Sequence, residues 1–576
     1  MTVLQCIPFE KILNPMLHPE VKCIDMRIMM LTPPILNIFM DLYIICLPIP
    51  SVLTLQMNLR RKVTVVSVLA FGIISVTVAI IRLPILISVS SMKTDLSIDA
   101  GKMIIVASFE VQYRINMDWL LVTSVAGISL LTLLTWRRYF SAISDIPGPF
   151  AASFTRLWHM HRILKGDQNL ELIRLHEQHG HFVRISYDEV SVSHPDAIAK
   201  ILVAPLHKAN WYKIHALPDY RFQSPMSTTD PKKKIEKSKY IAAAYTVSNL
   251  LRSEEHIDRT FESFLGWMDE YATAEKPMHL NTCISYLTFD VIGEIVFSKP
   301  FGFLAQGKDI GNSISNSLAL NAYIAVAGYF RWLNIALLAN PIMTWLSILP
   351  MGHLFDTVKS VLADREKNEN VRYDAVQYWF KQHEKHPDKF TVREIGTQAL
   401  AAVGAGSDTV AAGMQAFVYY MIRHEDAWER AHEEVNKAVE KGLCGGRVVS
   451  YADAQQLSFV QACVKEALRI FGPVPMGLPR IAPKGGLVIG DRIIPEGTIV
   501  SINRDIAAKE RYFIPFGAGY GGCPGQNIAK IELAKIAATL VRDYTIKQVD
   551  PTQDWQWNAY FTVVPHSWPV SIEKRV

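Results

Sequence analysis

Residues 513–544 read FIPFGAGYGGCPGQNIAKIELAKIAATLVRDY, and they place one cysteine, Cys523, in a glycine-rich loop. A helical pattern begins at about Gln526 and stays apolar on one face as far as Leu540. A cysteine binds a metal as its thiolate, and the N–H groups at the start of a helix lower the pKa of a thiol placed there. Pro524 fits the first helical turn, where it removes one competing N–H group. The stretch therefore predicts a thiolate ligand at the start of a long helix.

The glycines of this loop favour a flat cofactor. Glycine has no Cβ, so the backbone can pass close to a planar macrocycle such as haem. A cysteine thiolate is the axial ligand that favours cleavage of the O–O bond on haem. On the loop alone, a structural turn around a buried cysteine would also explain the pattern. The residues that carry it, besides the cysteine, are Phe516, Gly517, Gly519, Gly521, Gly522 and Gly525.

A second motif lies in the middle of a long apolar segment, where residues 401–417 read AAVGAGSDTVAAGMQAF. Glycine, serine, aspartate and threonine all lower helix propensity at such a place. A Thr409 hydroxyl bonded to the preceding turn could open a groove for dioxygen. Asp408 and Thr409 could then deliver protons. Taken alone, the same small residues would fit a close crossing of two helices.

A third motif is the segment VKEALRIFGPVPMGLPR at residues 464–480. Glu466 and Arg469 are three residues apart and share one helical face. By itself such a pair is usually a surface salt bridge. A cluster of prolines ends the helix, and Arg480 follows, where it could reach a haem propionate.

Together and in this order, the three motifs resemble those of the cytochrome P-450 superfamily. Residues 405–409 match (A/G)-G-x-(D/E)-T, residues 466–469 match E-x-x-R, and residues 516–525 match F-x-x-G-x-(R/H)-x-C-x-G. The resemblance covers about residues 117–576. It implies a mainly α fold with small β-sheets. Residues 181–194, 485–503 and the C-terminus alternate as strand pairs would.

The resemblance also implies the cofactor and the roles of the site residues. Haem b would be bound with Cys523 as the axial ligand to iron. Further cofactor-binding residues would be Arg480, Phe516, Gly517 and Gly525. Asp408 and Thr409 would be catalytic, as a proton relay. Glu466 and Arg469 would be a structural pair.

The activity implied is that of a monooxygenase that takes electrons from NADPH through a reductase. Residues 471–491 and 562–572 resemble the fungal pisatin demethylase-type branch, which implies hydroxylation or O-demethylation of a small lipophilic compound in secondary metabolism or detoxification. Residues 211–227 and 319–349 would line the pocket. One alternative is a catalytically inactive membrane protein with a defective haem domain. Another is a haem-thiolate isomerase or dehydratase, which the intact Asp408-Thr409 pair disfavours.

Two features depart from the family pattern. Gly521 stands where the family has arginine or histidine to bind a propionate, so this role would fall on Arg480 and on Lys239. The interval from Glu466 to Cys523 is also shorter than in the family. A segment that the family has near residues 503–504 is missing, so Asn503 is followed directly by the residues that lead to the Cys523 loop. The missing segment carries the arginine that completes a buried triad with the E-x-x-R pair, and neither Arg504 nor Arg511 has its context. A buried ion pair that loses a partner is destabilised, so poor folding and weak haem binding are expected.

The N-terminal part predicts membrane segments. The chain is 50% hydrophobic, and its mean hydropathy is +0.14. Residues 63–81 and 119–136 are long, uncharged runs, and a less regular run covers 28–55. Arg137 and Arg138 follow the last run, which places the rest of the chain in the cytoplasm, with the anchor in the endoplasmic reticulum membrane.

Residues 41–110 resemble a fragment of the fungal rhodopsin-like integral membrane family. The sequence therefore divides into a membrane segment at 1–116, which is a candidate gene-model fusion, an anchor with a basic linker at 117–144, and a haem-thiolate domain at 145–576. The net charge is only +5, which predicts no nucleic-acid partner, and the basic run Lys232–Lys234 is expected to be a solvated loop. The seven cysteines form no C-x-x-C pair, which argues against a zinc site and a disulfide framework.

Overall fold

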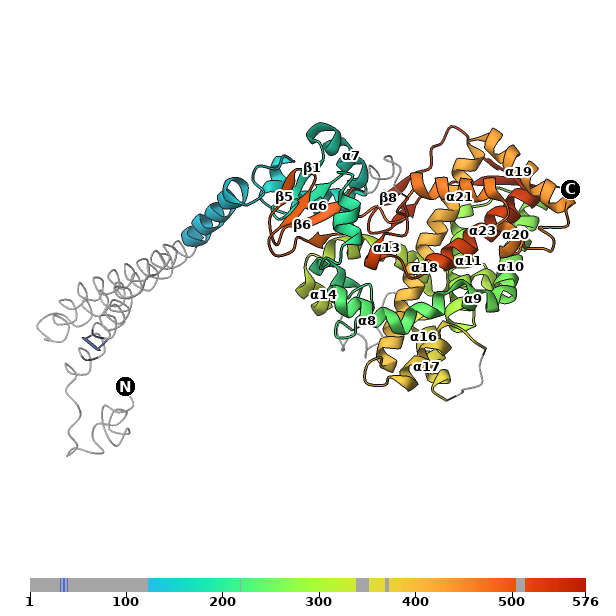
Figure 1. Cartoon of the computed structure of the whole chain (residues 1–576), viewed down its shortest axis with the longest axis horizontal. Helices are drawn as coiled ribbons and strands as arrows, with labels where there is room; N and C mark the ends of the chain where they lie inside the picture. Colours follow the sequence, from blue (N-terminus) through green and yellow to red (C-terminus); the bar gives the residue numbers. More distant parts are fainter. Residues whose placement is uncertain are drawn as a thin grey trace, which may run out of the picture. The chain divides into compact units, whose positions relative to one another are not determined.

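The computed structural model describes residues 123–217, 219–337, 352–367, 372–503 and 513–575, together with Thr32, Ile35, Leu36 and Phe39 (Figure 1). The chain divides into two compact units, Met1–Leu131 and Thr132–Val576. The predicted membrane run at 63–81 lies outside the described residues, as do all but four residues of the run at 28–55 and the junction arginines Arg504 and Arg511.

Long helices build the second unit, and α18 (Val392–Ile422) runs through its core (Figure 1). Thr391 and Glu394 begin this helix with a capping box, in which each side chain bonds the backbone N–H of the other. Helix α18 packs against α11 (Leu280–Phe297), α21 (Ser458–Ile470) and α23 (Gln526–Asp543). These four helices share one large apolar cluster, which is the main core of the unit.

The other α-helices surround this core or cover the small sheets. They are α6 (Leu157–Lys165), α7 (Gln168–His179), α8 (Pro231–Ile241), α9 (Val247–Leu250), α10 (Glu254–Thr273), α12 (Phe303–Gln306), α13 (Ser313–Ala327), α14 (Arg331–Leu337), α16 (Gly352–Arg365), α17 (Ala375–Lys385), α19 (Glu425–Glu440) and α20 (Tyr451–Ala454). Short 3-10 or π turns include η2 (Trp136–Phe140), η4 (Ile198–Val203), η5 (Asn210–His215) and η9 (Gly519–Gly521).

The strands form one four-stranded sheet and three two-stranded ones. The larger sheet has the order β1-β2-β6-β3, in which β2 runs parallel to β6 and the other neighbours are antiparallel. Two predicted hairpins are present: the first is β1/β2, and β4/β5 turns at Gly490. The prediction of a third strand pair at the C-terminus was wrong, because β9 pairs with β8 and β10 pairs with β7. The strands are β1 (Phe182–Ser186), β2 (Glu189–Val192), β3 (Arg480–Ile481), β4 (Leu487–Ile489), β5 (Arg492–Ile494), β6 (Ile499–Ile502), β7 (Tyr544–Gln548), β8 (Trp557–Ala559), β9 (Val563–Pro565) and β10 (Val570–Lys574).

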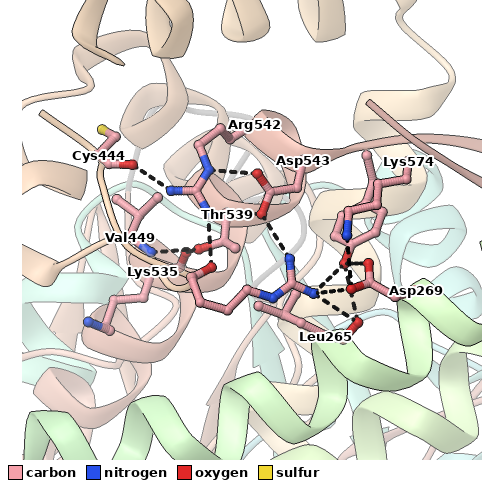
Figure 2. A network of polar contacts seen from close by, with 11 residues as sticks. Leu265, Asp269, Cys444, Val449, Lys535, Thr539, Arg542, Asp543 and Lys574 are labelled. Atoms are coloured by element: carbon pink, nitrogen blue, oxygen red, sulfur yellow. Dashed lines mark hydrogen bonds and ion pairs between the residues drawn. The ribbon is translucent and has the colours of Figure 1, made fainter. Parts of the chain in front are cut away.

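A polar network fixes the C-terminal end of α23 (Figure 2). The Arg447 guanidinium lies 2.7 Å from an Asp269 carboxylate oxygen on α10. The Tyr544 hydroxyl donates to the other oxygen of that carboxylate at 2.7 Å. Arg542 donates to the Arg447 carbonyl oxygen at 2.9 Å, and the Lys574 ammonium lies 3.0 Å from Asp269. The network joins α10, α23 and the β7/β10 pair, so α23 is held at the end opposite to the Cys523 loop.

The predicted anchor is described from residue 123 onward. Residues 123–135 are helical, and their large apolar side chains are exposed, namely Val125, Ile128, Leu130, Leu131 and Leu133. Among the described residues, α11 alone is long and apolar enough to cross a membrane, but 78% of that stretch is buried inside the unit. Helix α11 is therefore a core helix, whereas the exposed apolar surface belongs to residues 123–135.

Candidate active site

The Cys523 loop closes on itself before α23 begins. The Cys523 N–H donates to the Phe516 carbonyl oxygen at 2.8 Å, and Gly525 is the N-cap of α23. Gly517 has a φ of +70°, a conformation that favours glycine. Phe516 packs on the main core, so the loop is attached at both ends and the cysteine lies at its tip.

Gly519 brings this loop against η4. A Cβ at Gly519 would lie 2.6 Å from the Cα of Val203, which no side chain could accept. The two backbones are therefore in direct contact, and glycine is required at this position.

The surroundings of the Cys523 thiol act on its pKa in both directions. Cys523 is exposed on one side, yet desolvation by the protein around it raises the pKa of the thiol. A backbone hydrogen bond from Gly525 and the positive charge of Lys234 act in the opposite direction. A metal ion at the open side would deprotonate the thiol outright.

Three cations gather beside the loop. Arg480, at the start of β3, is only 2% exposed and donates from Nη1 to the Tyr212 hydroxyl at 2.7 Å. Lys208 is also buried, and its ammonium donates to the carbonyl oxygens of Pro225 and Met226, both at 2.9 Å. The Lys234 ammonium on α8 donates to the Tyr520 carbonyl oxygen.

This cation cluster (Lys208, Lys234 and Arg480) has no carboxylate among its contacts with the described residues. Burial and the charge of Arg480 push the pKa of Lys208 well below its usual value, and burial lowers that of Lys234 as well. The Arg480 Nε is buried and has no hydrogen-bond partner in the described part of the chain. Buried cations without an anion are costly, so the arrangement suits an anionic ligand.

Gly521 lies against the same cluster. A Cβ at Gly521 would be 3.0 Å from Nη2 of Arg480. The predicted alternative, Lys239, is exposed on α8, while Lys234 on the same helix reaches the loop. The expectation of a solvated loop at Lys232–Lys234 was wrong, because these residues form the first turn of α8.

The middle of α18 carries the second motif. The Thr409 hydroxyl donates to the Ala405 carbonyl oxygen at 2.8 Å, which is the predicted bond to the preceding turn. Gly404 and Ala405 are exposed in a helix that is otherwise largely buried. The helix therefore presents an open face beside Thr409.

Asp408 is buried in the same turn. Its carboxylate accepts from the Ser317 hydroxyl at 3.2 Å and from the Asn321 amide at 3.4 Å, both on α13. Burial raises the pKa of Asp408 to about 6. A carboxyl group with such a pKa can both hold and release a proton near neutral pH.

The E-x-x-R pair is formed, but at the surface. Arg469 donates to Glu466 through Nε at 2.7 Å and Nη2 at 2.6 Å. The side chains are 30% and 53% exposed, respectively. The hydrogen bond with Arg469 lowers the pKa of Glu466. The structure thus shows Glu466 exposed and Arg469 half-buried, joined by two hydrogen bonds.

Comparison with known proteins agrees with this geometry. The cytochrome P450 family model matches residues 147–509 and 503–567. The fungal rhodopsin domain model matches residues 1–116. A cytochrome P450 monooxygenase gsfF of Penicillium aethiopicum is 26% identical over 75% of this chain and 94% of its own length. The pisatin demethylase of Fusarium vanettenii is 27% identical over 79% of this chain and 94% of its own.

A solved cytochrome P450, CYP102L1, has the same fold, with a TM-score of 0.60 at 18% identity over 71% of this chain and 94% of that one. The chain belongs to the cytochrome P450 family, and its activity is that of a P450 monooxygenase. The family implies haem with a thiolate ligand, and the residues present fit it. Cys523 offers a sulfur open on one side, and the cation cluster offers buried positive charge, with one orphaned N–H group, to the acidic propionates.

Several residues of the site could not be identified from the three motifs. Lys208, Tyr212, Ser317 and Asn321 join the site through the fold alone. Lys234 had a local signal that was overlooked, because Asp230 followed by Pro231 is a helix start. Asp230 accepts from the backbone N–H groups of Lys232 and Lys233, which sets the direction of α8.

Proposed function

We propose that this P450 inserts one oxygen atom from dioxygen into a small lipophilic compound, by hydroxylation or O-demethylation, in secondary metabolism. Cys523 would ligate the iron of haem b, and electrons would come from NADPH through a reductase. The observation that carries the proposal is the pairing of an open thiol with a buried cation cluster that has no carboxylate among its described contacts. The fungal monooxygenase relatives support the reaction class.

The proposed mechanism assigns three tasks to the chain. Thiolate-bound haem supplies the activation of dioxygen. The cation cluster binds and orients the propionates, and the Gly525 N–H and Lys234 stabilise the thiolate. Asp408 would hold a proton in its buried carboxyl group and release it, and Thr409, with its hydroxyl fixed by Ala405, would pass it on.

The residues around the expected pocket support an apolar substrate. The Trp211 indole N–H donates to the Ala325 carbonyl oxygen at 3.0 Å, which joins the two stretches expected to line the pocket. The rings of Trp211 and Phe561 lie 5.3 Å apart. Tyr212, Met476 and Phe561 belong to the same aromatic and aliphatic cluster. Such surfaces bind aromatic or terpenoid compounds better than charged ones.

We also propose that the N-terminal part of the chain contains a membrane anchor and a junction between two units. The exposed apolar face of residues 123–135 supports a membrane anchor there, with the catalytic domain on the cytoplasmic side of the endoplasmic reticulum. The rhodopsin-type match ends at residue 116, just before this helix, which supports a junction between two unrelated units. The two P450 matches meet at residues 503–509, which supports a missing segment there.

A carbon monoxide difference spectrum of the reduced full-length chain in membranes tests the proposal. A Soret band at the long wavelength of a thiolate–iron–CO complex is expected. The band should vanish in Cys523→Ser and persist in Cys463→Ser, which changes a half-buried cysteine elsewhere. Absence of haem from the wild-type chain would favour the alternative of a catalytically inactive membrane protein.

A further inference from the structure

A connected cluster of aromatic side chains lies at the C-terminal end of α18, and almost all of its members are tryptophan or tyrosine. The Trp568 ring centroid lies 5.7 Å from that of Tyr419 and 6.0 Å from that of Trp555. The Trp555 ring lies 5.4 Å from both Tyr419 and Trp557. Tryptophan and tyrosine are the aromatic residues that lose an electron most readily, and phenylalanine would pack as well in an inert core. The tryptophan–tyrosine cluster consists of Tyr419, Tyr420, Phe471, Trp555, Trp557 and Trp568.

The inner end of the cluster is attached to the helix that carries the catalytic motif. Trp568 is 1% exposed, and its indole N–H donates to the Gln415 Oε1 at 3.3 Å. Gln415 follows Thr409 by six residues, which is about 9 Å along the helix at 1.5 Å per residue. The first oxidisable ring therefore lies within about two helical turns of the site.

The outer end of the cluster has a proton acceptor in contact with solvent. The half-buried Tyr419 donates from its hydroxyl to the Asp554 carboxylate at 3.4 Å, and this side chain is 85% exposed. The Trp555 backbone N–H donates to the same hydroxyl oxygen at 3.3 Å. Oxidation of a tyrosine releases its hydroxyl proton, so a carboxylate held against the hydroxyl favours the loss of an electron there.

The outer rings also face a cavity of about 320 Å³, which Tyr420, Phe471 and Trp557 help to line. Leu170 and Ile470 line the same cavity and are exposed, so it reaches solvent. A cavity of this volume accommodates a small molecule. A small soluble reductant such as ascorbate can therefore contact the outer rings.

We propose that the tryptophan–tyrosine cluster carries a single oxidising equivalent from the active site to the surface when no substrate consumes it. The monooxygenase activity established above activates dioxygen, so a strong oxidant forms at the site in each turnover. The inference goes beyond the proposed function and rests on it only for the source of that oxidant. A route of this kind would protect the chain from damage at the site.

The electrons and protons balance as follows. Trp568 gives one electron to the site and regains one from Tyr419, whose hydroxyl proton passes to Asp554. Ascorbate then returns one electron to Tyr419, and Asp554 returns the proton. The net change is the transfer of one electron from ascorbate to the site.

Pulse radiolysis of the full chain tests electron transfer in the cluster without haem. Azide radicals oxidise tryptophan faster than tyrosine at neutral pH, and the half-buried Trp557 is accessible from the cavity. In the wild type, the tryptophanyl absorption should decay as the tyrosyl absorption rises, and Tyr419→Phe should lose most of this transfer. Tyr240→Phe is the matched control, because the Tyr240 ring stacks on Phe390 outside the cluster.

Freeze-quenched electron paramagnetic resonance of the haem-loaded chain, mixed with a peracid in the absence of substrate, tests the source of the oxidising equivalent. A tyrosyl signal is expected in the wild type and in Tyr240→Phe, and it should be lost in Tyr419→Phe. Trp568→Phe should lower the signal severalfold yet keep the radiolytic transfer, because Trp555 still contacts Tyr419. Ascorbate should remove the signal without changing its origin.

Transfer in Tyr419→Phe as large as in the wild type would show that the cluster is only a packed core, and a tyrosyl signal that persists in this variant would show the same. Either result would overturn the proposal. A wild-type chain that binds no haem would instead refute the proposed function, and the radiolysis of Tyr419→Phe alone would then decide whether the cluster carries an electron.

Discussion

The guanidinium of Arg480 occupies the space beside Gly521 in which a side chain at that position would begin. Nη2 is 3.0 Å from the place of a Gly521 Cβ, and Arg480 itself is 2% exposed. The Arg480 guanidinium therefore lies where the family pattern places the basic side chain of position 521. Glycine at position 521 leaves the space that the Arg480 guanidinium fills.

Replacing Arg480 by methionine should weaken haem binding by about tenfold or more, because a charge-assisted hydrogen bond is worth roughly 1.5–3 kcal/mol. Titration of the apoprotein with haem, followed at the Soret band, measures this. Arg492→Met is the matched control, since Arg492 lies on β5 and pairs with the exposed Asp145. The double variant Arg480→Met/Gly521→Arg should regain part of the affinity, whereas Gly521→Arg alone should lose it. Unchanged haem affinity in all of these variants would show that Arg480 does not bind the cofactor.

Thr409→Val should lower the product formed per NADPH consumed by roughly 100-fold, the usual scale of a lost proton-transfer group. The carbon monoxide difference spectrum should stay intact, because Thr409 does not hold the haem. Ser407→Ala removes a hydroxyl that bonds the preceding turn of the same helix at 2.8 Å, so it controls for the helical bond itself. Equal losses in the two variants would assign the effect to helix geometry.

Asp408→Asn should stabilise the protein at high pH. Burial raises the pKa of Asp408 in the folded state to about 6, so the folded chain holds this proton more tightly than the unfolded chain. Stability from this group is therefore lost as pH rises between the two pKa values. The variant should gain roughly 2–3 kcal/mol above that window and nothing below it, at about 1.4 kcal/mol per pKa unit. Melting temperatures of both proteins at about pH 4 and pH 8 test the sign.

Glu466→Gln should cost less than about 1 kcal/mol in this chain, because the Glu466 side chain is 53% exposed to solvent. The midpoint of urea unfolding measures the change. In a longer protein that restores the segment near 503–504, the same substitution should lower the free energy of unfolding by about 3–5 kcal/mol, the scale of a broken buried ion pair. A large loss in the present chain would show that the pair is already part of a buried network.

The parts of the site that depend on local sequence could be predicted, and those made by the fold could not. The Cys523 loop and the Thr409 back-bond are set by residues within one or two turns, so the motifs located them. The cation cluster draws on Lys208, Lys234 and Arg480, which are far apart along the chain. No spacing rule brings such residues together.

The contacts of the Asp408 side chain could not be predicted from local sequence either. A helical pattern predicts that residues 408 and 409 lie on neighbouring faces, but it does not say which helix packs on each. The contacts with Ser317 and Asn321 come from α13, which had no motif of its own. The Glu466–Arg469 ion pair was readable from its spacing of three residues, but the exposure of Glu466 was not, because it depends on what packs against α21.

The contact between Gly519 and Val203 has a mechanical consequence. The loop that carries Cys523 rests backbone to backbone on η4, and η4 packs within the cluster formed around the four-stranded sheet. The far end of α23 is meanwhile fixed to α10 by the Asp269 network. The Cys523 loop is thus held from two sides, by the sheet cluster through η4 and by α10 through α23, so a shift of the sheet relative to these helices would move the sulfur. Hydrogen exchange at the Gly522 amide, which bonds Gly519 at 3.0 Å, would report that motion directly.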